Sequence, residues 1–307
     1  MANSIPKRQN EEDQLRFLRA RQQTYAQATR FLLAQLVVTL LVPLVGAVLA
    51  IIHPPAKPYV AAASLVVLLL DILWLDRRQK TLVKRAAKIA EHYDCAVLEL
   101  PWNEFTVGDR IEAEEIHSAA KAYAKHHDDT RLRDWYPIEV GALPLLLGRI
   151  VCQRTNLHYD RRLRTMYGDA IRAGAIFVVL VMVIYGLAQN LSITAWVLTM
   201  APAAPVLAWA GREFYRQHDT AEPLEKLLRE ARKFWNDALF NGCDESQCLI
   251  RSREFQNAIY SRRSSSPLVF PLVYRFRRAQ LEDEMHDGAA DFLKQYEQAK
   301  SSPLTPK

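Results

Sequence analysis

Four long apolar segments, arranged as two closely spaced pairs, constrain the fold of this chain more than any other feature. The first pair comprises residues 31–52 and 59–75, and the second comprises residues 173–188 and 191–211. A helix needs roughly 17–25 apolar residues to cross the hydrocarbon core of a bilayer. Residues 59–75 and 173–188 lie near the lower limit, where flanking residues or local thinning of the lipid complete the span. The sequence therefore predicts an integral membrane protein with two transmembrane helical hairpins.

The distribution of lysine and arginine sets the expected orientation, because basic residues accumulate in cytoplasmic loops. The loop within the first pair contains only Lys57, and the loop within the second pair contains no basic residue. The outer flanks are basic and hold Arg30, Arg77, Arg78, Lys80, Arg161, Arg162, Arg164, Arg172, Arg212 and Arg216. We therefore expect residues 1–30, 76–172 and 212–307, and with them both termini, to be cytoplasmic.

The net charge of +6 suggests an anionic partner until it is divided along the chain. Residues 76–172 hold 17 basic and 15 acidic side chains, and residues 212–307 hold 16 and 15. Such mixing of signs is typical of solvated helices with surface salt bridges. It is not the basic surface of a DNA- or RNA-binding protein. Membrane orientation and attraction to anionic lipid explain the positive excess.

Hydrophobic periodicity outside the spans predicts an all-α protein with mainly helical cytosolic segments. The second span is expected to continue into the cytoplasm as one long helix, because apolar residues from Leu82 onward alternate with basic ones. Residues 95–100 form a short strand-like run that ends at Pro101. Further helices are predicted at residues 112–127, 143–167, 222–239, 256–260 and 274–296.

The first thirty residues are expected to form a cytosolic helix that starts near Glu11 and runs into the first span. The acidic residues after Asn10 suit the positive end of a helix dipole. Leu15, Leu18 and Tyr25 share one face of this helix. That face packs on the protein's own cytosolic part, the commoner arrangement for a short amphipathic stretch, or it contacts a membrane surface or a partner.

The sequence contains no catalytic constellation, and we expect neither an enzyme nor a metal or cofactor site. There is no Gly-rich phosphate loop and no nucleophile or metalloprotease motif. Glu114 and His117 have the spacing of half a di-iron motif, but the other half is missing. Cys243 and Cys248 lack a second pair of zinc ligands.

Three arginine clusters are candidates for an anion site, because guanidinium groups bind phosphate through paired hydrogen bonds. The positive-inside rule explains the cluster at residues 161–164. Arg262 and Arg263 precede a serine-rich loop at residues 264–267, which suits either an anion site or an ordinary surface loop. Arg278 ends a third cluster. Arg262, Arg263 and Arg278 are therefore the candidate ligand-binding residues.

Several short motifs stand in a fixed order along nearly the whole chain. They are PKRQN at 6–10, LRAR at 18–21, LPWN at 100–103, WYP at 135–137, CQRTN at 152–156 and FQNAI at 255–259, with Asp160, Leu163, Arg164, Tyr167, Arg262 and Tyr274 between or after them. In this pattern the chain resembles the bacterial small four-transmembrane (S-4TM) pore-forming effectors. His158 and Tyr159 depart from the pattern, because more tryptophan is expected there.

The resemblance implies a role in anti-phage conflict systems that signal through nucleotides. Such effectors are encoded beside nucleotidyltransferases that make cyclic di- or oligonucleotides, and they respond by permeabilising the bacterial inner membrane. The resemblance therefore implies an effector located in that membrane, with a cyclic di- or oligonucleotide as its activating ligand.

A pore would require a homo-oligomer, because two hairpins cannot enclose a wide aqueous channel. The available lining is weakly polar and consists of Gln35, Thr39, Ser64, Ser192, Thr194 and Thr199. Asp71 is the only ionisable residue within the spans and lies about one turn from the cytoplasmic end, where it can pair with Arg77 or Arg78. Asp71, Thr39 and Thr199 are the candidate pore or gating residues.

Two other functions are compatible with the same sequence. A membrane-anchored sensor or scaffold would recruit a cytosolic partner without opening a pore, and most of the chain is indeed cytosolic. A small transporter or membrane enzyme would need charged side chains within its spans, and only Asp71 is present there.

Overall fold

Helices are the only regular elements in the part of the chain that the computed structural model describes. These residues are 3–42, 45, 46, 49, 52, 53, 55, 57–200, 204–242 and 244–301. The elements are α1 (Ile5–Arg8), α2 (Glu12–Leu36), η1 (Val37–Leu41), α4 (Lys57–Leu70), η3 (Asp71–Leu75), α5 (Asp76–Val97), α6 (Glu104–Val107), α7 (Ala113–Ala124), η4 (Ile138–Ala142), α8 (Leu145–Ala188), α9 (Ile193–Met200), α10 (Ala204–Asn236), η6 (Asp237–Gly242), α11 (Glu245–Ser265) and α12 (Pro271–Ser301).

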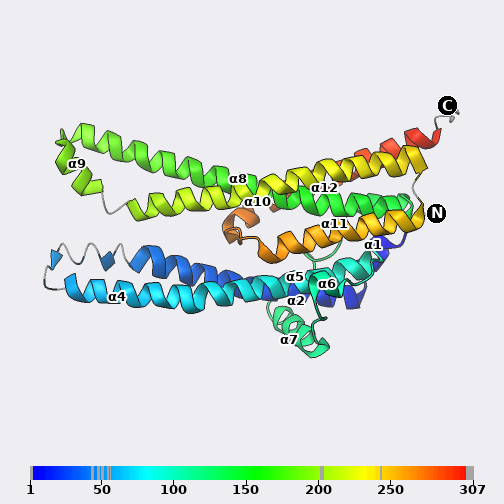
Figure 1. Ribbon diagram of the computed structural model, residues 1–307, viewed down its shortest axis with the longest axis horizontal. Helices are drawn as coiled ribbons and strands as arrows, with labels where there is room; N and C mark the ends of the chain where they lie inside the picture. Colours follow the sequence, from blue (N-terminus) through cyan, green and yellow to red (C-terminus); the bar gives the residue numbers. More distant parts are fainter. Residues whose placement is uncertain are drawn as a thin grey trace.

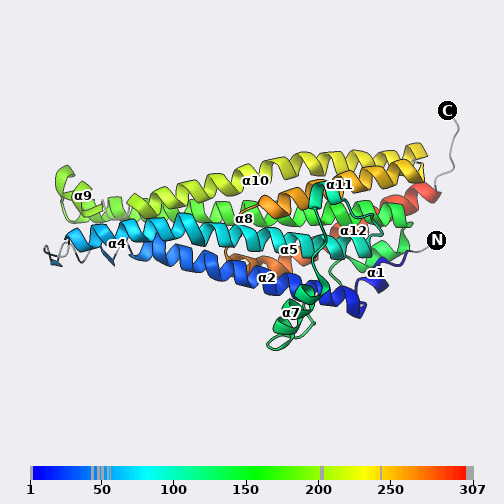
Figure 2. The ribbon, with the colours of Figure 1, turned by 60° about the horizontal axis from the view of Figure 1, so that its bottom comes forward.

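The hydrophobic core lies at the end of an elongated bundle that carries both termini (Figures 1 and 2). Helix α8 packs along α10, and α2 packs against α5 and α7. Trp235 is 1% exposed, and its ring meets Phe292 edge-on at 4.7 Å between ring centroids. Leu15 and Leu18 of α2 belong to the same core. The apolar face of the N-terminal helix therefore packs on the protein's own core and not on an external surface.

The predicted strand-like run at residues 95–100 is wrong. Cys95 and Val97 lie in the last turn of α5, and the backbone N–H of Leu98 still donates to the carbonyl of Asp94 at 2.9 Å. Val97 and Leu98 are fully buried because they continue the apolar face of this amphipathic helix. The helix ends before Glu99, which adopts a left-handed backbone with φ of 53°. The amphipathic helical pattern of α5 therefore determines the secondary structure at its end, and the β-type composition of four residues there does not.

Several predicted helices are parts of longer ones. The predictions at residues 143–167 and 173–188 fall on the single 44-residue helix α8, which contains no proline that would break it. The prediction at 222–239 falls on α10, which has already begun at Ala204, and then on η6. Helix α11 extends well beyond residues 256–260 in both directions. Helix α8 thus continues into the apolar segment at residues 173–188 without interruption, whereas short π-helical turns, η1 and η3, join α2 and α5 to their apolar segments.

Two pairs of helices extend from the core away from the termini and form two arms (Figure 1). One arm contains α4 and η1, and the other contains the far ends of α8 and α10, which α9 connects. Large apolar side chains are exposed on both arms, for example Leu65 at 64% and Phe177 at 67%. Among the described residues, α8 is the one helix that is long and apolar enough to cross a membrane. Two transmembrane hairpins with cytoplasmic termini remain a prediction.

Candidate functional site

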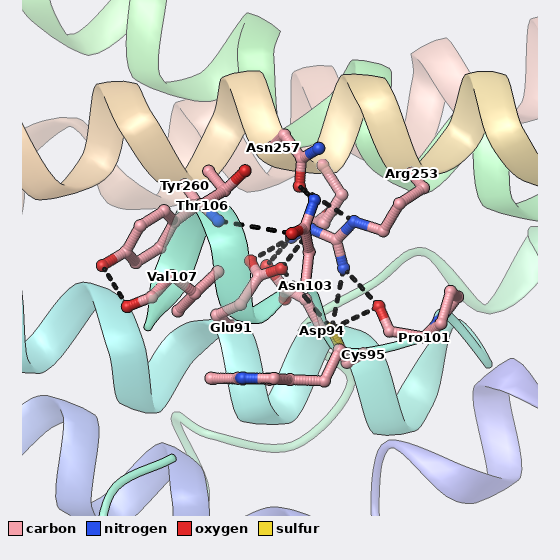
Figure 3. A network of polar contacts seen from close by, with 12 residues as sticks. Glu91, Asp94, Cys95, Pro101, Asn103, Thr106, Val107, Arg253, Asn257 and Tyr260 are labelled. Atoms are coloured by element: carbon pink, nitrogen blue, oxygen red, sulfur yellow. Dashed lines mark hydrogen bonds and ion pairs between the residues drawn. The ribbon is translucent and has the colours of Figure 1, made fainter. Parts of the chain in front are cut away.

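Two carboxylates buried side by side on α5 form the centre of a polar network (Figure 3). Glu91 and Asp94 are both 0% exposed. The Gln256 amide on α11 donates to both of them, at 2.8 Å to Glu91 and 2.9 Å to Asp94. Arg253, also on α11, forms an ion pair with Glu91. Burial raises the pKa of Glu91, and the positive charge of Arg253 acts in the opposite direction.

Arg253 fixes α11 to the segment that follows α5. Its guanidinium donates to the Pro101 carbonyl at 2.8 Å, to the Cys95 sulfur at 3.1 Å and to the Asn257 side chain at 3.0 Å. Burial and the charge of Glu91 raise the pKa of the Cys95 thiol to about 12. Cys95 is therefore a neutral acceptor in this network and not a reactive thiolate.

Asp94 connects the same network to α8 and to a cavity. Its carboxylate accepts hydrogen bonds from the Tyr136 hydroxyl at 2.7 Å and from Arg263 at 2.8 Å. The Asn156 amide of α8 donates to the Tyr136 oxygen at 3.0 Å. Arg263 also lines the cavity, so one side chain joins α5 to that space.

The cavity has a volume of about 840 Å³ and lies among α2, α8, α11 and α12. Its lining is rich in arginine and aromatic side chains. The arginines are Arg21, Arg131, Arg164, Arg262, Arg263 and Arg278, and the aromatic residues are Tyr25, Tyr123, Trp135, Tyr159 and Tyr274. The carboxylates that line it are Asp160 and Glu282. The lining is therefore strongly cationic, although residues 76–172 and 212–307 as a whole are nearly neutral.

Arg21 of α2 is buried in this lining without a counter-ion. It is 5% exposed, and its guanidinium lies 4.2 Å from the centre of the Trp135 ring. It forms no ion pair with any described carboxylate. Burying an unpaired charge costs free energy, and stacking on an aromatic ring recovers only part of it. The arrangement fits a site that receives its negative charge from a ligand.

Two further arginines of the lining are held by internal partners. Arg164 of α8 ion-pairs with Asp160 at 2.9 Å and donates to the Gln217 side chain and the Pro267 carbonyl, both at 2.9 Å. Arg278 of α12 ion-pairs with Glu282. These partners orient the guanidinium groups toward the cavity and leave further N–H groups available.

The structure brings together all three arginines that the sequence singled out. Arg262, Arg263 and Arg278 line the one cavity, although Arg278 comes from a different helix. The positive-inside rule was expected to explain the whole cluster at residues 161–164, and Arg164 does not fit that expectation. It is 6% exposed and lies in the cavity wall. The neighbouring Arg161 pairs with Glu225 outside the cavity and fits that assignment.

The candidate pore residues lie in the arms. Asp71 begins η3, and its carboxylate is hydrogen-bonded by Gln35 of α2. The ion pair with Arg77 or Arg78 that the sequence allows for Asp71 is not formed within the described part of the chain. The side chains of Thr39 and Thr199 lie outside the described residues. Their role in a pore remains a prediction.

Sequence reasoning missed Arg21, Tyr25, Trp135 and Asp94. Arg21 and Trp135 stand in the LRAR and WYP motifs, which we quoted only for the resemblance. An arginine on an otherwise apolar helix face needs a partner, so the sequence could have indicated the pairing of Arg21 with Trp135. Nothing in the sequence marked Asp94 as part of the site, since its partner Arg263 lies 169 residues away.

Because of His92, the folding stability of the protein is expected to depend on pH. Its ring lies between Phe17 and Trp102, at centroid distances of 5.3 and 4.5 Å, and its Nε2 accepts from the Ile111 N–H at 3.2 Å. Burial, together with the nearby charges of Arg110 and Lys88, lowers the pKa of His92 to about 4. The unfolded chain binds this proton near pH 6.5, so folding stability falls as the pH drops from about 6.5 to about 4.

After allowance for solvent screening, we expect His92 to contribute about 1–2 kcal/mol to this loss. The measurement is the free energy of unfolding in detergent at several pH values, for the wild type and for His92→Gln. Glutamine retains an acceptor for Ile111 but does not titrate. Equal acid sensitivity of the two proteins would show that His92 is not responsible.

Comparison with known proteins assigns the chain to a family. The model of the SMODS-associating 4TM effector domain matches residues 3–292, which contain the network and the cavity. A probable CBASS effector molecule of Bacillus cereus (strain VD146) is 19% identical over 284 residues, covering 90% of this chain and 94% of that protein. No solved structure matches the chain. These matches confirm the resemblance to four-transmembrane effectors, and the chain belongs to the SMODS-associating 4TM effector family.

Proposed function

We propose that this protein is a membrane effector of anti-phage defence that binds a cyclic di- or oligonucleotide in the arginine-lined cavity and then permeabilises the bacterial inner membrane as a homo-oligomer. The similar protein of Bacillus cereus is named a probable CBASS effector, which supports the defence role. The observation that carries the ligand assignment is Arg21, a buried cation without a counter-ion in the cavity wall.

The composition of the cavity supports a nucleotide over a simple anion. Arginine side chains bind phosphate through paired hydrogen bonds, and aromatic rings stack on bases. Trp135 and Tyr159 line the same space as the arginines. The cavity volume of about 840 Å³ lies within the usual range of about 300–1,000 Å³ for small-molecule sites. A phosphate group alone would leave most of this space unfilled.

Arg263 supports a path from the ligand to the first arm. It lines the cavity and donates to Asp94 on α5, and α5 continues through η3 into α4. A phosphate in the cavity competes with Asp94 for the Arg263 guanidinium. A change in this contact favours one arrangement of α5 over another, which is how a ligand shifts a conformational equilibrium.

The exposed apolar arms support the second half of the proposal. Each arm presents large apolar side chains outward, as helices in lipid do. Several copies would have to associate around a path lined by the weakly polar residues of the arms. Asp71, Thr39 and Thr199 are the proposed pore or gating residues in that assembly.

Dye release from vesicles tests the whole proposal. The purified protein is reconstituted into vesicles that contain a self-quenched dye, and cyclic di- and oligonucleotides are added from the cytoplasmic side. We expect one of these nucleotides to release dye, and linear mononucleotides to release none. Binding of a cyclic nucleotide without release from correctly inserted protein would favour the sensor or scaffold function. Absence of both binding and release would reject the proposal.

A further inference from the structure

A second concave surface lies at the base of the two arms. This groove has a volume of about 1150 Å³ and runs between η3–α5, α10 and the loop after α11. Its lining includes Leu73, Arg77, Lys84, Arg216, Arg262 and Ser266. None of the assignments made above uses it as a site.

Basic side chains outnumber acidic ones in the groove by five to two. Lys80 pairs with Asp76 at 2.8 Å, and Arg216 pairs with Glu213. Arg77, Lys84 and Arg262 form no ion pair within the described part of the chain. Three cationic groups of the groove are therefore left to bind an anion that the protein does not supply.

The groove also has an apolar end and a buried hydroxyl. Leu73 lies at that end and is 67% exposed. The hydroxyl of Ser266 is in the lining, is 7% exposed as a residue and has no hydrogen-bond partner within the described chain. By contrast, Ser264 and Ser265 donate to the Ser261 carbonyl of their own helix. A ligand with a polar head and an apolar tail satisfies both features.

Along the first arm, the groove lies at the level where the surface of a membrane is expected. The apolar run of that arm ends at Leu75, and Arg77 and Lys84 follow at about 3 and 14 Å along the helix axis, at about 1.5 Å per residue. The headgroup layer on each side of a bilayer is about 5–8 Å thick. The groove therefore begins within the headgroup layer and extends into the cytosol.

We propose that this groove binds the headgroup of an anionic phospholipid, with the phosphate at Arg77, the acyl chains along Leu73, and Lys84 adding positive charge on the cytosolic side of the headgroup layer. The inference rests on the membrane position of the arms in the proposed function, and it depends neither on the nucleotide nor on pore formation. Arg262, Ser266 and Leu268 line both the groove and the cavity. A lipid in the groove therefore contacts one wall of the ligand cavity.

Lipid retention in native mass spectrometry tests this site with the full-length protein. The protein is taken from nanodiscs of mixed phosphatidylcholine and phosphatidylglycerol, and the retained lipids are counted. We expect the wild type to retain phosphatidylglycerol preferentially. The double variant Arg77→Gln, Lys84→Gln is expected to lower the retention of phosphatidylglycerol about 25-fold. Each basic residue near a membrane surface contributes about fivefold to the attraction of anionic lipid. Both side chains are exposed and unpaired, so the fold should be preserved.

The matched control is Arg78→Gln with Arg212→Gln, which removes the same charge from exposed residues that follow the apolar runs but do not line the groove. We expect this control to retain phosphatidylglycerol like the wild type. An equal loss in both variants would show general attraction to the surface and overturn the site. Displacement of the lipid by glycerol phosphate would show a site for soluble anions and overturn it too. Nucleotide binding, measured separately, should be unchanged in either variant, which distinguishes this site from the cavity.

Discussion

Arg21→Met is expected to weaken binding of the activating cyclic nucleotide about 100-fold while leaving the ligand-free protein at least as stable as the wild type. Truncating one partner of a buried charge pair costs roughly 2–5 kcal/mol of binding free energy, and about 2.7 kcal/mol corresponds to 100-fold. In the free protein Arg21 is a buried cation that pairs with no carboxylate among the described residues. Methionine keeps the contact with the Trp135 ring and removes the unpaired charge.

The opposite signs of the two effects distinguish a binding role from a structural one. The measurements are the dissociation constant by calorimetry and the free energy of unfolding in detergent without nucleotide. Arg229→Met is the matched control, because Arg229 lies on α10 with a 64% exposed side chain and does not line the cavity. A variant at Arg21 that unfolds more easily and still binds the nucleotide would show that Arg21 only stabilises the fold.

Arg253→Met is expected to have the largest effect on stability and to destabilise the protein by about 3–5 kcal/mol. The substitution leaves the Glu91 carboxylate, which is 0% exposed, without a charged partner in the interior. It also removes the hydrogen bonds to the Pro101 carbonyl and the Asn257 side chain. Protonation of Glu91 removes the buried charge, so this loss should shrink as the pH falls.

A double variant separates the charge from the packing. Glu91→Gln combined with Arg253→Met removes both charges and keeps an acceptor for Gln256, so we expect it to recover most of the lost stability. Chemical unfolding followed by tryptophan fluorescence gives the free energies. If the double variant were as unstable as Arg253→Met alone, loss of the contacts around Pro101 would be the cause, and the buried charge would not be.

The helical nature of this chain could be read from its sequence, whereas the ends of its helices could not. The long apolar segments and the amphipathic pattern of α5 are local properties, and local properties are visible in the sequence. Residues 95–100 looked like a strand because four apolar or β-branched residues stand together. Cys95 and Val97 instead continue the amphipathic pattern of α5, which ends at Val97. They pack in a core built from distant segments, including Tyr136.

Part of the lining of the arginine-rich cavity was visible in the sequence for a similar reason. Arg262 and Arg263 are neighbours next to a serine-rich loop, and such clusters are recognisable without a structure. Arg21 is isolated on its helix, and its significance comes from Trp135, which lies 114 positions later. The absence of a counter-ion around it is a property of tertiary packing alone.

Because α8 is long, a small tilt at the cavity would cause a larger displacement at the far end of the helix. Arg164 in the cavity wall and Ala188 at the far end are separated by about 36 Å of unbroken helix, at about 1.5 Å per residue. A tilt of only about 5° at the cavity would displace the far end by about 3 Å, roughly the width of a water molecule. Its neighbour α10 contains Pro223 within the helix, whereas α8 contains no proline. A small adjustment of side chains around a ligand is therefore enough to shift the outer arm by a distance that matters for water.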